Sequence, residues 1–260
     1  MHVGGAQWQD AKMDLLVPPG ASYVFDLTNS HARRRRRALE RHAQHVEEVL
    51  DASARRNEIW RQAGGTWRPT EPGLAAAMDQ VGAEGRDALA HTLPGIVEMY
   101  LQTRWNAAVR ADYDRLAPYA VLFLQWETSF PAEWREANLY SPWGMKKQIL
   151  RGFAKVGVPQ ACQGELIELL ATAVRREHRC EDGGYSALAR RVDGPELRSM
   201  LADAAGSTDP LVRLRAEYIL WVVENPRAPV TVAGWRRWLA DDDVSHGTDT
   251  SGTAAGGGAE

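Results

Sequence analysis

The placement of proline and glycine constrains the fold of this chain more than any other feature. Six prolines each stand in front of a segment with helical periodicity: Pro94, Pro131, Pro142, Pro159, Pro195 and Pro210. The first turn of a helix accepts proline well, because the N–H that proline lacks would have no partner there. Glycines at 157, 183–184 and 206 fall where those segments should end. This punctuation predicts an all-α protein, an irregular multi-helix array or bundle.

The helices that this pattern predicts are short, and no convincing strand follows residue 30. They are expected near residues 74–90, 94–110, 115–128, 131–138, 143–155, 160–180, 185–192, 195–205, 210–224 and 231–240. The clearest of them is 210–224, because Asp209 is suited to cap its start and Asn225-Pro226 to end it.

One long helix should precede this array, over residues 29–65. Asn29 or Ser30 is suited to cap its start, and Gly64-Gly65 to stop it. Apolar residues recur along it at intervals of three and four, which indicates one buried stripe. A proline-containing segment, TWRPTEPG, follows at 66–73 and is the best candidate for a linker.

The two ends of the chain look different from its middle. Residues 1–28 contain two short β-prone runs around a Pro-Pro-Gly turn, and we expect an extended N-terminal arm rather than a hairpin. Residues 241–260 have almost no large apolar side chains, which predicts a disordered tail. The expected organisation is therefore an arm (1–28), an arginine-rich helix (29–65), a helical domain (74–240) and a tail (241–260).

Composition bounds the class of protein. A hydrophobic fraction of 44%, a charged fraction of 25% and a net charge of -3 are ordinary globular values, and they argue against a surface that is basic throughout. The first twenty residues lack the apolar core of a signal peptide, and no apolar run is long enough to span a membrane. We therefore expect a cytoplasmic protein that does not bind membranes, in which Cys162 and Cys180 are buried or inert thiols.

The most unusual motif is a run of five arginines at the start of the long helix. Arg33, Arg34, Arg35, Arg36 and Arg37 encircle the helix, and their charges oppose its dipole. Glu40 is spaced to relieve two of them, and Asp51 is spaced to pair with Arg55. The run is either a solvated helix start or a contact surface for an anionic partner.

Two candidate sites for chemistry have simpler structural explanations. His42 and His45 are spaced like two metal ligands but lack a third, and His42 lies on the apolar stripe, which favours a half-buried structural histidine. His178 and Cys180 could form a nucleophile pair, yet helix electrostatics explains the charges around them. We identify no catalytic residue, no cofactor site and no metal site, so the sequence indicates a non-catalytic protein.

Aromatic residues concentrate between Tyr100 and Trp143, with arginines interleaved. Such a mixture builds helical cores, and it also anchors interfaces or stacks on bases. Most of these residues are expected in the core. Trp134 stands between charged residues in a short segment, so it is the candidate for an exposed surface anchor.

A further stretch resembles the turn of a helix-turn-helix. Ala202, Gly206 and Val212 fall at the small, glycine and aliphatic positions of that motif. The second helix would then expose Arg213 and Arg215. Its following turns are too apolar for a groove-facing helix, so two packed helices joined by a glycine turn explain the pattern as well.

Three functional hypotheses follow. The first is a helical interaction or adaptor protein, with a protein partner that contacts Arg33–Arg37 and Trp134. The second is a nucleic-acid-associated regulator that uses the same arginines or the turn motif near 196–222. The third is an enzyme whose site is assembled from scattered residues.

Overall fold

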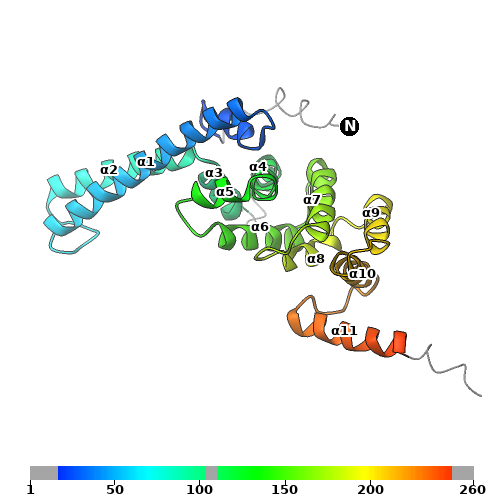
Figure 1. Cartoon of the computed structure of the whole chain (residues 1–260). Helices are drawn as coiled ribbons and strands as arrows, with labels where there is room; N and C mark the ends of the chain where they lie inside the picture. The colour runs from blue at the N-terminus through cyan, green and yellow to red at the C-terminus, as the bar shows by residue number, and fades with distance from the viewer. Residues whose placement is uncertain (1–16, 104–109, 248–260) are drawn as a thin grey trace, which may run out of the picture. The chain divides into compact units, whose positions relative to one another are not determined.

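The computed structural model describes residues 17–103 and 110–247, and for 241–247 the backbone alone. These residues form helices and no strand, so the chain is an all-α multi-helix array with one long N-terminal helix (Figure 1). None of the helices that the model describes is long and apolar enough to cross a membrane. Predictions for residues 1–16, for Trp105 and for residues 248–260 lie outside the described residues.

The helix starts agree closely with the proline pattern, whereas Gly183 and Gly184 begin a helix, although the glycine pattern predicted that they end one. The elements are η1 (Ala21–Thr28), α1 (Ala32–Gln62), α2 (Pro72–Ala90), α3 (Leu93–Thr103), α4 (Arg110–Ser129), α5 (Pro131–Glu136), α6 (Pro142–Val156), η3 (Gln160–Cys162), α7 (Gln163–Arg175), α8 (Gly183–Ala189), α9 (Pro195–Ala205), α10 (Pro210–Glu224) and α11 (Val232–Gly247). Prolines open α2, α5, α6, α9 and α10. The carboxylate of Asp209 accepts hydrogen bonds from Leu211 N (2.9 Å) and Val212 N (3.4 Å), which confirms the predicted cap of α10.

Three local predictions are wrong. The arm is not extended over Ala21–Thr28, where a 3₁₀ helix buries Ala21, Val24 and Leu27. The tail is not irregular from residue 241, because α11 continues to Gly247. The predicted helix 160–180 ends at Arg175 and is followed by a loop. At Ala21–Thr28 the packing of η1 on α1 and α4 overrode the local composition.

The chain divides into two compact units, residues 1–169 and residues 170–260. The boundary is therefore not at the predicted linker 66–73. That segment instead closes a helical hairpin, because α1 and α2 pack against each other as antiparallel neighbours (Figure 1).

The first unit has an aromatic core, contributed mainly by α3, α4 and α6. Tyr100 and Tyr113 pack with ring centroids 5.0 Å apart, and Phe153 lies 5.5 Å from Tyr100. The element η1 covers α4 through Phe25, whose ring centroid is 5.2 Å from that of Tyr119. This packing holds the beginning of α1 against the rest of the unit, since η1 also packs on α1.

The second unit is built around α10. This helix packs on α8 and α9, and Tyr218 on α10 contacts Trp235 and Trp238 of α11 at 4.5 and 5.3 Å between ring centroids. Trp238 is buried. Arg190, at the end of α8, holds the end of α10, because its guanidinium donates to the carbonyl oxygens of Val222 (3.0 Å) and Asn225 (2.9 Å).

Candidate functional site

The arginine run occupies the first turns of α1, and nothing in those turns offsets its charge. His31 is the N-cap residue and its side chain makes no capping hydrogen bond, so the predicted caps by Asn29 or Ser30 are wrong. The side chain of Asn29 is used otherwise: it accepts from His31 N (2.9 Å) and donates to Asp26 (2.8 Å). No acidic residue lies in the first turn. The positive end of the helix dipole therefore coincides with the arginine charges.

Arg35 is not available to a partner. It lies on the same side of α1 as Ala38 and His42, three and seven residues further along, and both are buried. Its Nε donates to both carboxylate oxygens of Glu133 (3.1 and 3.3 Å), and its guanidinium carbon lies 3.8 Å from the ring centroid of Phe130. Arg35 thus anchors α1 to α5, and the hypothesis that all five arginines form one contact surface is wrong for this residue.

The other four arginines share one property: each is exposed and has no ion-pair or hydrogen-bond partner among the described residues. We call this set the arginine surface, and it consists of Arg33, Arg34, Arg36 and Arg37. The pairing expected with Glu40 does not form there, whereas Asp51 does pair with Arg55, at 3.1 Å. Because Arg35 is fixed on the opposite side, these four side chains are held toward solvent.

The surface has a defined limit along α1. Arg41, the next arginine, packs on η1, with its guanidinium carbon 5.2 Å from the ring centroid of Tyr23. Exposed acidic residues begin at Glu40 and continue at Glu47, Glu48 and Asp51. The arginine surface therefore covers only about 6 Å of helix axis before the sign of the exposed charge changes.

Trp134 is not a surface anchor. Its side chain is fully buried, with ring centroids 5.3 Å from Phe123 and 4.8 Å from Trp143, both in edge-to-face geometry. The short helix α5 turns this residue inward while Arg135 and Glu136 face solvent. The charged neighbours that suggested exposure belong to the opposite side of the same short helix.

His42 and His45 lie in different surroundings. His42 is fully buried against Trp126, with ring centroids 5.5 Å apart, which confirms a structural role. Burial, with a smaller effect of His45, lowers the pKa of His42 to about 4, so its ring is neutral at physiological pH. His45 stacks on His91 at 5.0 Å, and within the described part of the chain no group of His, Cys, Asp or Glu side chains could hold a metal ion.

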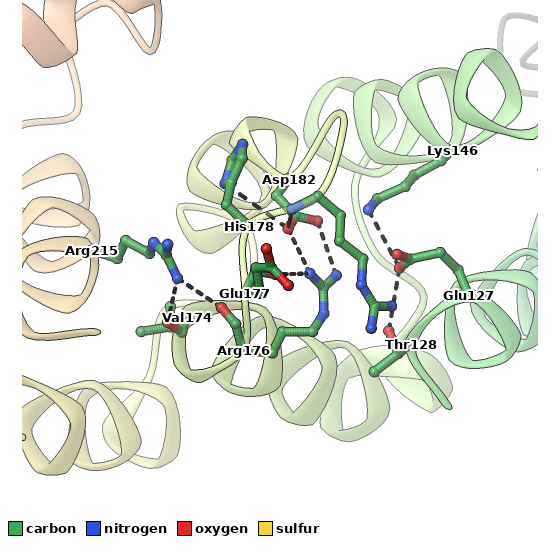
Figure 2. A network of polar contacts seen from close by, with 10 residues as sticks. Glu127, Thr128, Lys146, Val174, Arg176, Glu177, His178, Asp182 and Arg215 are labelled. Carbon is green, nitrogen blue, oxygen red and sulfur yellow. Dashed lines mark hydrogen bonds and ion pairs between the residues drawn. The ribbon is translucent and has the colours of Figure 1, made fainter. Parts of the chain in front are cut away.

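The loop after α7 is organised by Asp182, which the sequence did not single out. The Arg176 guanidinium donates to both of its oxygens (2.7 and 3.0 Å), and the Arg179 N–H donates at 2.7 Å (Figure 2). His178 Nδ1 lies 4.0 Å from the same carboxylate. An aspartate so fully engaged has a structural role in this loop.

The two cysteines lie in different environments, contrary to the expectation of one shared helix. Cys162 is buried in η3, and burial, with smaller effects of Glu165 and Asp114, raises its pKa to about 12. That thiol is inert, as predicted. Cys180 is exposed in the loop after α7, so of the two predicted alternatives, buried or inert, the first is wrong there.

The turn motif between α9 and α10 offers less positive charge than expected. Arg213 is exposed, but Arg215 Nη1 donates to the carbonyl oxygens of Arg176 (2.7 Å) and Val174 (3.4 Å) (Figure 2). Those carbonyls belong to the end of α7, where acceptors lack partners and a positive charge is favourable. Arg215 therefore caps α7 within the second unit.

A buried ion pair lies in the core of the first unit. Lys146 Nζ is 3.3 Å from a carboxylate oxygen of Glu127, and both side chains are fully buried (Figure 2). The ammonium group also lies 5.4 Å from the ring centroid of Trp143. The pair joins α4 to α6. No sequence signal identified it, because the partners are nineteen residues apart and belong to different helices.

No protein-family model, no curated protein and no solved structure matches this chain significantly.

Proposed function

We propose that this chain is a helical interaction protein that binds an acidic segment of another protein through the arginine surface. The observation that carries the proposal is the contrast between Arg35, which is anchored, and its four neighbours, which are exposed and unpaired. A solvated helix start would require no such fixed orientation.

The surface is suited to carboxylates. Guanidinium groups bind carboxylates with two parallel hydrogen bonds, and the positive end of the α1 dipole adds to the attraction. In the free protein the four like charges repel one another and oppose the dipole. An acidic partner would relieve both effects at once, so the unfavourable charge density favours binding.

The exposed charges favour an acidic protein segment over a nucleic acid. Phosphates follow one another along a nucleic-acid strand, and affinity grows with the number that are neutralised. The four arginines cover about 6 Å of α1, and the exposed Glu40, Glu47, Glu48 and Asp51 that follow would repel a longer polyanion. The net charge of -3 points the same way.

The test replaces all four arginines of the arginine surface by glutamine. A matched control carries the same change at four exposed arginines elsewhere: Arg213, Arg227, Arg236 and Arg237. The proteins are tagged, expressed in their native cells and purified after nuclease treatment, and their partners are quantified by mass spectrometry.

We expect one stoichiometric protein partner with the wild type and the control, and its loss with the arginine-surface variant. Equal recovery with both variants would refute the proposal. If the bound material disappears on nuclease treatment and retention on DNA or RNA is salt-sensitive, the nucleic-acid hypothesis replaces it.

A further inference from the structure

A second exposed feature lies at the opposite end of α1, where the hairpin with α2 turns. Trp67, in the connecting loop, stacks on Trp60 of α1 with ring centroids 5.6 Å apart and 28° between the planes. The Arg56 guanidinium carbon lies 5.2 Å from the ring centroid of Trp67. We call Arg56, Trp60, Trp67 and Arg68 the hairpin-end surface.

Trp67 is exceptional in its exposure. Its side chain is 51% exposed, while every other tryptophan whose side chain is described is buried or half-buried. Tryptophan contributes more contact area than any other side chain, and it is enriched among the residues that dominate binding energy. A half-exposed indole on a defined platform is therefore a candidate anchor for a partner.

The loop holds Trp67 in place before any partner arrives. Gly64 and Gly65 have φ values of 67° and 84°, a region that residues with a Cβ rarely adopt, and they end α1 with hydrogen bonds to Arg61 O and Trp60 O. Further along, Arg68 N donates to Thr66 Oγ1 at 3.2 Å. An indole fixed in this way loses little side-chain entropy on binding.

The charges beside Trp67 indicate what kind of segment it would bind. Arg56 and Arg68 are exposed and have no acidic partner among the described residues, whereas Arg55 and Arg61 are paired with nearby carboxylates. Of the nearby exposed acids, Glu58 pairs with Arg61, and Glu71, the N-cap residue of α2, pairs with neither Arg56 nor Arg68. The surface therefore combines one exposed indole with two guanidinium groups that have no carboxylate partner among the described residues, and that of Arg56 also lies over the indole.

We infer that the hairpin-end surface is a docking site for an acidic protein segment that also carries an apolar side chain. The apolar side chain would pack on the exposed part of the Trp67 indole, and the flanking carboxylates would bind Arg56 and Arg68. A single-stranded nucleic acid would also stack on the indole, but two guanidinium groups neutralise few phosphates. The observations therefore favour a peptide.

This surface is distinct from the arginine surface. Arg37 and Trp60 are separated by about 35 Å along α1, so one short segment would not reach both. The two surfaces would make the hairpin bivalent, as expected of an adaptor. Each is testable without the other, because they share no residue.

The experiment selects short random peptides by phage display on the purified full-length protein and measures the affinity of the enriched peptides by fluorescence anisotropy. Trp67→Ala is the principal variant. Arg56→Gln with Arg68→Gln is the second, since both side chains are exposed and the fold does not depend on them. Leu50→Ala is the matched control, because Leu50 is 53% exposed on the same helix.

We expect peptides that combine carboxylates with an apolar side chain, and a loss of affinity of about tenfold or more for either variant. Leu50→Ala and the arginine-surface variant should bind as the wild type does. No enrichment, peptides without acids, or affinities unchanged by Trp67→Ala would each overturn the inference. So would tighter binding of a labelled poly-uridine strand that Trp67→Ala abolishes, which would assign the surface to nucleic acid.

Discussion

Acid should destabilise the first unit through His42, and replacing this residue by leucine should remove the effect. The imidazole is fully buried beside Trp126, and neither ring nitrogen has a hydrogen-bond partner in the part of the chain that the model describes. Because burial removes the ring from water, the folded state disfavours its charged form and lowers the pKa of His42 to about 4.

The sign and size of this change in stability follow from the protons that the folded and unfolded states bind. Between the folded value of about 4 and the ordinary value of 6.5, the unfolded chain binds a proton at His42 and the folded protein does not. The contribution of His42 to the free energy of unfolding is therefore fully present above pH 6.5, and it falls as the pH decreases toward about 4. The loss attributable to His42 is about 2 kcal/mol at about pH 5 and approaches about 3 kcal/mol at lower pH.

The assay measures urea unfolding at about pH 7.5 and about pH 5, read out by pulsed hydrogen exchange on peptides from α4, so that it reports on the first unit. The free energy of unfolding of the wild type should fall by about 2 kcal/mol more than that of His42→Leu. His31→Gln, at the exposed N-cap position of the same helix, is the control and should behave as the wild type. Equal losses in the wild type and His42→Leu would refute the reasoning.

Three further outcomes are expected. Arg35→Gln should lower the free energy of unfolding by about 1 kcal/mol, since its ion pair is only partly buried, while Arg36→Gln should change it by less than about 0.5 kcal/mol. Urea titration measures both variants, and equal effects would contradict the role of Arg35 as an anchor. Lys146→Met should cost about 3 kcal/mol in the same measurement, because it leaves a buried carboxylate without its ammonium partner; a neutral effect would argue against the pair. In the native protein an alkylating reagent should modify Cys180 within minutes and Cys162 only after unfolding, and peptide mass spectrometry would reveal the opposite order.

Local sequence was sufficient for the helices. Proline at a helix start and glycine at a helix end act within a few residues, through a missing N–H and an accessible positive φ. The bounds of α9 and α10 consequently agree with prediction residue for residue. The prediction failed at residues 21–28, because the burial of Val24 and Leu27 depends on α1 and α4 rather than on neighbouring residues.

The sequence could not show which of several residues of the same type is paired or buried in the folded protein. Arg35 and Arg36 are adjacent and identical, yet only Arg35 meets Glu133, ninety-eight residues away. For the same reason the sequence did not indicate that Trp134 is buried and that Trp67 is exposed. Charged neighbours suggested an exposed Trp134, which the core of the first unit buries, while Trp67 lies in a loop whose composition suggested only a linker.

The sequence by itself therefore determined the class of fold, the positions of most helices and the existence of an unusual arginine run. The tertiary structure alone decided which arginines are anchored, which tryptophan is exposed and which ionisable groups are buried. Helix formation depends on interactions three or four residues apart, which are local in the chain. Burial and pairing depend on residues brought together from distant helices, and that information appears only when the chain is folded.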